Sequence, residues 1–307
     1  MAKAKRIEGV LSPVVTPFKR DYAPDPERFV RHCRWLLKNG CSGLAVFGTN
    51  SEANSMSVPE KRRLLEALIA GGVSPAALMP GTGHCALTDS VELSRAAVEM
   101  GCAGVLMLPP FYYKNVPDEG LYRNFAEVIE RVGDERLQLY LYHIPPVSQV
   151  PISLGLIERL LGKYPGIVAG VKDSSGDWSN TKAMLDNFAK GGFDVFAGSE
   201  EFLLANMRHG GKGCITATGN INPGPIDNLY RNWRSPDADR MQAAITATRK
   251  IVQKQPMIAA LKATVAHFGN DPQWKTLRPP LIELNSAQEK DLISELRANG
   301  FSMPELG

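Results

Sequence analysis

A lysine at the end of an apolar stretch is the residue of this sequence best suited to covalent chemistry. Lys172 follows the short, β-rich run Ile167–Val171 and precedes the turn formers Ser174, Ser175 and Gly176. This pattern is typical of a buried strand that ends in a loop. A desolvated lysine loses its proton more readily, and the neutral amine attacks a carbonyl carbon to form a Schiff base. A structural lysine paired with Asp173 or Glu200 is the alternative interpretation.

A tyrosine supplies the proton transfers that Schiff-base chemistry requires. A carbinolamine must lose water, and the carbon beside the imine must exchange protons, so a donor and acceptor is needed close to the nitrogen. Tyr142 ends the apolar stretch Leu137–Tyr142, which precedes the stretch that Lys172 ends. We therefore expect the two side chains to be neighbours. A tyrosine that only caps the core is the alternative.

Eight short apolar segments, separated by segments of helical periodicity such as Glu60–Ile69 and Ser179–Ala189, must position these residues. Eight βα units favour the α/β class and a (β/α)8 TIM barrel, because parallel strands need crossover helices. An open doubly wound sheet is the alternative, but no glycine turn follows the first segment. The predicted strands are Gly9–Pro17, Gly43–Gly48, Ala76–Gly81, Gly104–Leu108, Leu137–Tyr142, Ile167–Lys172, Asp194–Ala197 and Gly213–Thr218.

Strand signals stop near residue 235. Three helices are predicted after it, over Ala238–Gln253, Pro256–Phe268 and Gln288–Asn299. No Ser/Gly linker separates them from the preceding part. We therefore expect a catalytic barrel over residues 1–235 and, over residues 236–307, a C-terminal helical extension packed on it.

Three motifs at predicted strand ends carry a family resemblance. They are Gly48-Thr49-Asn50-Ser51-Glu52 for G-T-[TS]-G-E, Tyr142-His143-Ile144-Pro145 for Y-N-x-P, and Gly170-Val171-Lys172-Asp173 for G-[IV]-K. Further likeness begins at Pro110, Gly198, Gly211 and Arg278. From about Gly9 to Leu284 the chain resembles the pyruvate-dependent class I lyases, which include dihydrodipicolinate synthase and N-acetylneuraminate lyase.

The resemblance implies a role for each matching residue. Lys172 forms the imine with pyruvate, and Tyr142 shuttles protons. Thr49 and Tyr113 are the relay partners, the latter supplied across a subunit interface of a homotetramer. Thr49, Asn50 and Ser51 hold the pyruvate carboxylate, and Glu52 is structural in its loop. The imine is covalent, so no cofactor and no metal is expected. The further substrate-binding residues are Val147, Gly198, Glu200, Glu201 and Ile215.

Departures from the family pattern bear on the substrate. The family has Thr or Ser where this chain has Asn50, Gly where it has Ser51, and Asn where it has His143. The change from Gly to Ser51 raises the question of which backbone angles the loop adopts. Synthases carry an arginine at the position of Val147, which grips a carboxylate in a bidentate way. Valine favours the aldolase branch, where Glu200 and Glu201 would bind sugar-acid hydroxyls. The alternatives are a dihydrodipicolinate synthase and, for the two glutamates, a helix N-terminal role.

Composition excludes several function classes. The 307 residues carry a net charge of only +3, and no basic stripe lies beyond the first six residues, which disfavours nucleic-acid binding. No run of about 18 apolar residues predicts a membrane span, and the N-terminus lacks the apolar stretch of a signal peptide. The cysteines show no Cys-x-x-Cys spacing, which fits a reducing cytoplasm.

Two competing functions remain open. A metal-dependent aldolase would use residues such as His84, His143 and Glu52, but their spacing is not that of helix-borne ligands and the lysine would be unexplained. A non-catalytic barrel that binds a keto acid would need no lysine–tyrosine pair. A small-molecule 2-keto acid is therefore the expected partner.

Overall fold

Parallel strands and helices alternate along the chain, which the computed structural model describes at residues 5–304 and 306. The α/β class predicted from the sequence is confirmed. The chain divides into two compact units, one formed by Met1–Glu8 with Ser74–Ile215 and the other by Gly9–Val73 with Thr216–Gly307. No helix in the described part of the chain is long and apolar enough to cross a membrane.

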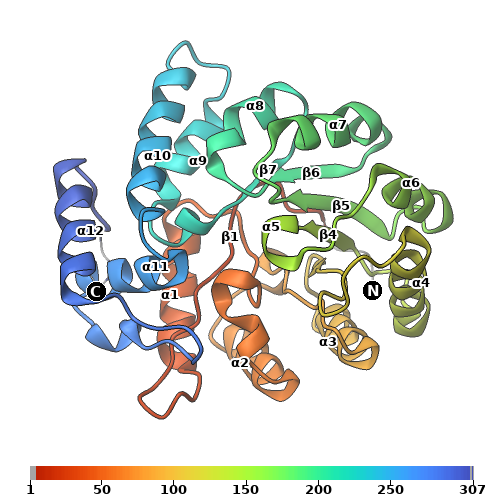
Figure 1. Cartoon of the computed structure of the whole chain (residues 1–307), viewed down its shortest axis with the longest axis horizontal. Helices are drawn as coiled ribbons and strands as arrows, with labels where there is room; N and C mark the ends of the chain where they lie inside the picture. Colours follow the sequence, from red (N-terminus) through yellow and green to blue (C-terminus); the bar gives the residue numbers. More distant parts are fainter. Residues whose placement is uncertain (1–4, 305, 307) are drawn as a thin grey trace. The chain divides into compact units, whose positions relative to one another are not determined.

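The unit built on Ser74–Ile215 contains five strands that pair in parallel in the order β3-β4-β5-β6-β7. Figure 1 shows its larger helices on the outer side of these strands. Its elements are η3 Pro75–Ala77, α3 Leu87–Glu99, β3 Val105–Met107, α4 Asp118–Val132, β4 Leu139–His143, α5 Pro145–Ser148, α6 Leu154–Lys163, β5 Val168–Asp173, α7 Trp178–Phe188, η4 Ala189–Gly191, β6 Asp194–Ala197, η5 Glu200–Phe202, α8 Leu203–Arg208 and β7 Gly213–Ile215.

The second unit contains the parallel pair β1 and β2 and the remaining helices of the described residues. Two of its helices begin with a capping box, formed by Ser57 with Glu60 and by Asn285 with Gln288. Its elements are β1 Gly9–Ser12, α1 Pro26–Lys38, β2 Gly43–Leu44, η1 Thr49–Ser51, η2 Ala53–Ser55, α2 Val58–Ala70, η6 Ala217–Asn220, α9 Pro223–Arg231, α10 Ala238–Val252, α11 Met257–Phe268, η7 Pro272–Lys275 and α12 Ser286–Ala298.

The prediction of a strand over Ala76–Gly81 is wrong. The segment begins as the 3-10 helix η3 and then has only isolated bridge residues, Leu78 and Gly81, of which Gly81 pairs with Leu106. Backbone hydrogen bonds still join it to β3, from Ala103 N to Leu78 O and from Leu106 N to Pro80 O. Pro80 has no N–H, so the segment cannot donate there and no regular ladder forms. The other seven predicted strands are present, most of them shorter than predicted.

A β-bulge sets the register between β4 and β5. Leu139 pairs with Val168 but the next residue, Tyr140, pairs with Gly170, so that Ala169 has no partner of its own. Gly170 fits only without a side chain, because a Cβ there would come within 2.4 Å of Asp194 O. β5 is buried along its whole length. After the bulge Tyr142 lies opposite Lys172, and His143 lies opposite Asp173.

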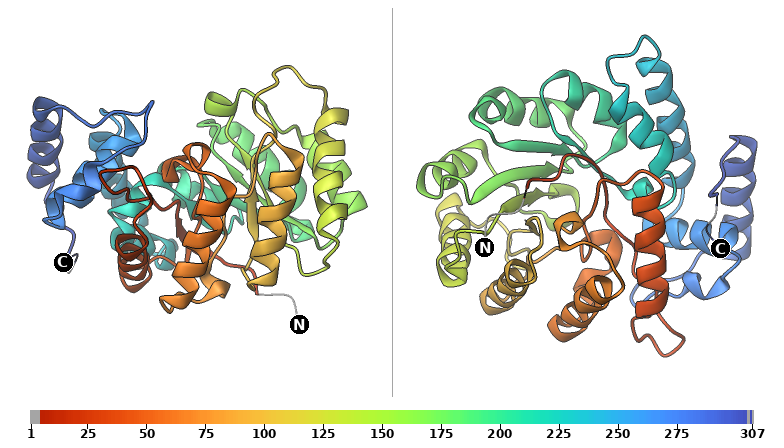
Figure 2. Two further views of the ribbon diagram at one scale, coloured as in Figure 1. Left: turned by 90° about the horizontal axis from the view of Figure 1, so that it is seen from below. Right: turned by 180° about the vertical axis from the view of Figure 1, so that it is seen from behind.

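The three predicted C-terminal helices are confirmed as α10, α11 and α12. α12 packs on α10 and α11 (Figure 2). α11 also packs against the turn η1. α11 carries a lysine, Lys262, in an otherwise apolar run. The boundary between a barrel and a helical extension at residue 235 stays a prediction.

Candidate active site

The carboxyl ends of β4 and β5 bring Tyr142 and Lys172 together. The two residues are direct register partners, and the Nζ atom of Lys172 lies 4.2 Å from the centroid of the Tyr142 ring. Each residue is only 3% exposed. A desolvated ammonium over an aromatic ring gains about 2 kcal/mol, which is enough to hold the flexible lysine side chain in one direction. The neighbourhood predicted for this pair is confirmed.

The alternative in which Lys172 pairs with Asp173 does not fit the contacts. The Asp173 carboxylate accepts hydrogen bonds from Ser175 N (2.9 Å), Asn180 Nδ2 (3.1 Å) and Thr181 Oγ1 (2.6 Å). Within the described residues of its unit, no carboxylate lies within ion-pair distance of Lys172. Asp173 follows Lys172 directly, so its side chain points to the opposite face of the strand.

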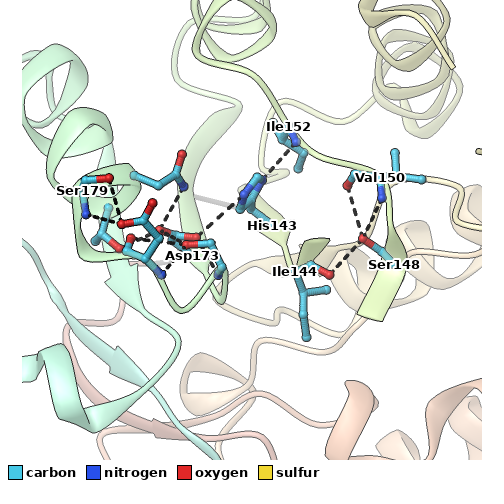
Figure 3. A network of polar contacts seen from close by, with 11 residues as sticks. His143, Ile144, Ser148, Val150, Ile152, Asp173 and Ser179 are labelled. Atoms are coloured by element: carbon cyan, nitrogen blue, oxygen red, sulfur yellow. Dashed lines mark hydrogen bonds and ion pairs between the residues drawn. The ribbon is translucent and has the colours of Figure 1, made fainter. Parts of the chain in front are cut away.

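A second pair, His143 and Asp173, lies on that opposite face. They are also register partners, and Nε2 of His143 lies 4.0 Å from Oδ1 of Asp173. Nδ1 of His143 accepts a hydrogen bond from Ile152 N at 3.0 Å (Figure 3). Burial lowers the pKa of His143, and the Asp173 carboxylate opposes that change. Sequence reasoning noted His143 as a departure from asparagine and as a residue that a metal-dependent aldolase could use, and missed this arrangement.

The segment that follows β4 carries Val147, which lies in the short helix α5 and is 62% exposed. The hydroxyl of Ser148 donates to Ile144 O at 3.0 Å and accepts from Val150 N at 3.2 Å (Figure 3). Nζ of Lys114 donates to Ser148 O at 2.8 Å and also to Phe111 O. Hydrogen bonds within the segment thus hold its turn together, and those from Lys114 join it to the loop before α4.

Tyr113 lies in that loop and is 71% exposed. Its ring meets the exposed ring of Tyr112 edge to face, at a centroid distance of 5.4 Å. Neither tyrosine is buried within the chain, and among the described residues no hydrogen bond or ring contact joins Tyr113 to the Tyr142–Lys172 pair.

The end of β6 leads into the predicted substrate-binding residues Gly198, Glu200 and Glu201. Gly198 N donates to Asp173 O at 2.7 Å, and a Cβ at Gly198 would meet that same oxygen at 2.6 Å, so only glycine allows this approach. Glu200 is fully buried and Glu201 is half-buried, both in η5. Ile215, at the end of β7, is fully buried.

The predicted carboxylate loop lies in the other unit. Thr49 and Asn50 are half-buried, whereas Ser51 is buried. The Ser51 hydroxyl donates to Val14 O and accepts from Gly48 N at 3.1 Å, so it closes the turn. Glu52, not Ser51, has the left-handed conformation, with φ of 56°. A serine in place of glycine at position 51 therefore needs no unusual backbone angle.

Glu52 is held by a buried ion pair that sequence reasoning did not identify. Its Oε1 lies 2.6 Å from Nζ of Lys262, and its Oε2 accepts from Arg278 N at 2.9 Å. Both side chains of the ion pair are completely buried. Desolvation lowers the pKa of Lys262 to about 8, although Glu52 favours its charged form. The structural role inferred for Glu52 is confirmed, and the lone lysine in the apolar stretch of α11 was the available signal.

The predicted site residues are thus divided between the two units. Tyr142, Lys172 and the substrate-binding residues after β4, β6 and β7 belong to one, and Thr49, Asn50 and Ser51 belong to the other. Among the residues described, no three His, Cys, Asp or Glu side chains are grouped so as to hold a metal ion. His84 instead faces Asp89, with Nδ1 3.6 Å from the carboxylate.

Comparison with known proteins decides the family. Residues 6–299 match the Dihydrodipicolinate synthetase family. The chain belongs to this family. It is therefore a lyase, as the resemblance of its three motifs implied.

Individual known proteins are similar to this chain along nearly their whole length. An uncharacterized DapA-like lyase of Chloroflexus aurantiacus is 34% identical, over 94% of this chain and 95% of that protein. The crystal structure of dihydrodipicolinate synthase from Agrobacterium tumefaciens has a TM-score of 0.88 at 30% identity, covering 94% of this chain and 98% of the other. A 2-keto-3-deoxygluconate aldolase variant of Sulfolobus solfataricus shares the fold, with a TM-score of 0.85 at 20% identity over 95% and 96% of the two chains.

The buried ion pair generates a stability prediction. Lys262→Met leaves the Glu52 carboxylate buried without its cation, so the free energy of unfolding should fall by about 3–5 kcal/mol. Urea denaturation followed by circular dichroism measures this change. The double variant Glu52→Gln/Lys262→Met contains no buried charge and should recover much of the loss. Lys254→Met, which removes an exposed ion pair with Glu295, should change stability by less than about 1 kcal/mol. Equal effects of Lys262→Met and Lys254→Met would contradict this account.

Proposed function

We propose that this lyase forms a Schiff base between Lys172 and pyruvate or a 2-keto-3-deoxy sugar acid. The observation that carries the proposal is the Tyr142–Lys172 pair, in which a buried amine lies 4.2 Å from the ring of a tyrosine on the neighbouring strand. No cofactor is required, because the lysine itself supplies the electron-withdrawing centre once the imine has formed.

The proposed reaction proceeds in steps that need one amine and one proton carrier. The neutral amine of Lys172 attacks the keto carbon, and the carbinolamine loses water to give an iminium ion. The iminium withdraws electrons from the bond between the third and fourth carbons, and loss of the hydroxyl proton releases an aldehyde. The enamine that remains takes up a proton, and water then releases pyruvate and the lysine. Tyr142 carries the protons in these steps.

The loop residues Thr49, Asn50 and Ser51 have the remaining proposed roles. Thr49, Asn50 and Ser51 would hold the keto-acid carboxylate through side-chain and backbone donors, and Thr49 would pass protons to Tyr142. We also propose that the fold is a (β/α)8 barrel, which the TM-score of 0.88 to the A. tumefaciens enzyme over 94% of the chain supports.

We further propose that the chain works in the cytoplasm as a homotetramer. Tyr113 is exposed, and among the described residues its ring contact is with Tyr112, which supports a contribution to the site of another subunit. The exposed pair Tyr112 and Tyr113 provides an aromatic surface suited to such a contact.

The substrate preference rests on the segment after β4 and on η5. Val147 offers no cation at the position where synthases carry an arginine. Three other cations could replace the arginine: Lys114, Arg123 and Lys212. Lys114 donates to the backbone oxygens of Phe111 and Ser148, while Arg123 and Lys212 are engaged in ion pairs with Glu119 at 2.7 Å and Glu8 at 2.8 Å. Glu200 and Glu201 provide acceptors for hydroxyl groups. A hydroxylated keto acid or a neutral aldehyde therefore fits better than aspartate semialdehyde.

The imine is tested by trapping. Incubation with pyruvate and borohydride should convert the Lys172 amine to a secondary amine, which intact mass and peptide mapping detect as one added carboxyethyl group. Lys172→Ala should take up none. Lys182→Ala, which removes an exposed lysine paired with Asp186, should be modified like the wild type. A folded wild type that stays unmodified would rule out the Schiff-base mechanism.

The role of Tyr142 is tested by Tyr142→Phe. The ring that contacts the Lys172 amine is retained, so the variant should fold and still trap pyruvate. Loss of the hydroxyl should lower turnover by about 10²-fold or more, the scale of general acid–base catalysis. Steady-state kinetics on the preferred substrate measures the loss. Near-normal turnover would remove Tyr142 from the mechanism.

The substrate class is tested by comparing kcat/KM for pyruvate plus aspartate semialdehyde with that for several 2-keto-3-deoxy sugar acids. A charge-assisted hydrogen bond contributes about 1.5–3 kcal/mol, so its absence should weaken aspartate semialdehyde use by one to two orders of magnitude. Val147→Arg should restore about that factor. Efficient condensation by the wild type, at about 10⁴ M⁻¹s⁻¹ or more, would instead establish the synthase alternative.

A further inference from the structure

The segment 144–152, which carries Val147, is attached to the core of its unit by His143. Ile152 N, at the far end of the segment, donates to Nδ1 of His143 at 3.0 Å (Figure 3). Between these two points the Ser148 hydroxyl holds the turn together through Ile144 O and Val150 N. His143 thereby closes a nine-residue loop at its base.

The other edge of the imidazole faces the loop after β5. Nε2 lies 4.0 Å from Asp173, whose carboxylate accepts hydrogen bonds from Ser175, Asn180 and Thr181. Asp173 is the charged group that faces the ring, and both side chains of the pair are almost completely buried. One ring therefore joins the loop after β4 to the loop after β5.

The partners of the ring fix its protonation. A backbone amide can only donate, so Nδ1 must be the unprotonated nitrogen, and the proton of the neutral ring lies on Nε2, toward Asp173. An imidazolium would place two donors against each other at Ile152 N. The bond to Ile152 therefore exists only while His143 is neutral.

We propose that His143 is a positioning residue that holds the 144–152 segment, and with it Val147, in place through the neutral ring and so sets the acceptance of the second substrate. This inference rests on the proposed function for its effect on substrate use. The tether itself is a property of the chain and can be measured without any reaction.

Two variants separate the two edges of the ring. His143→Asn introduces the residue that the family has at this position. Its amide oxygen lies near the place of Nδ1 and can still accept from Ile152 N, but the shorter side chain does not reach Asp173. In His143→Gln the longer amide reaches toward Asp173, and the acceptor at the Nδ1 position is lost. His143→Leu removes both contacts while keeping an apolar side chain in the buried site.

Hydrogen exchange of the Ile152 amide tests the tether. At neutral pH the wild type and His143→Asn should protect this amide, whereas His143→Gln and His143→Leu should lose protection by about tenfold or more, with protection elsewhere in β4 and β5 unchanged. On acidification below the ordinary histidine pKa of 6.5, protection should fall further in the wild type than in His143→Asn, which has no ring to protonate. Equal protection in wild type and His143→Gln would overturn the inference.

Kinetics tests the consequence for substrate use, with 2-keto-3-deoxygluconate cleavage as the probe. His143→Gln should raise KM by about tenfold and change kcat less, while borohydride trapping of pyruvate at Lys172 is retained. An unchanged KM together with lost amide protection would overturn the specificity role. Failure of the wild type to trap pyruvate would count against the proposed function alone, since the amide measurement does not depend on it.

Discussion

The parallel pairing of β4 with β5 is the constraint on which the rest of the site depends. Side chains alternate between the two faces of a strand, so register partners share a face and consecutive residues do not. Tyr142 and Lys172 therefore meet on one face, and His143 and Asp173 meet on the other. The chemistry and the support for the surrounding loops come from four residues at consecutive positions of two strands.

The Thr49–Glu52 turn is held rigid by a different kind of interaction. Its polar residues follow a strand of only two residues, which offers little backbone support. A buried ion pair between Glu52 and Lys262, with a further bond from Arg278 N, fixes the turn from α11 and the segment after it. Removing one partner of such a pair lowers the free energy of unfolding by far more than the intact pair contributes to it. The arrangement therefore favours a single geometry of the turn.

Local features of the fold were predictable from the sequence, and long-range contacts were not. The apolar run ending at Lys172 and the periodicity of α10, α11 and α12 gave correct elements, because burial pattern determines both. The prediction failed at Ala76–Gly81, where the apolar pattern suits a strand but Pro80 lacks the donor that a ladder needs. The bond from Ile152 to His143, and the pairing of Glu52 with Lys262 across 210 residues, follow no spacing rule. Only the tertiary arrangement reveals them.

The bulge at Ala169 has a consequence for how related chains are assigned an activity. If Ala169 paired with Tyr140 in a regular ladder, Tyr142 would lie opposite Val171, and His143 would lie opposite Lys172. A homologue that kept this residue but not the bulge would retain every letter of the tyrosine and lysine motifs and still present the wrong pair to a substrate. Annotation of such homologues should therefore compare the register of the two strands as well as the motifs themselves.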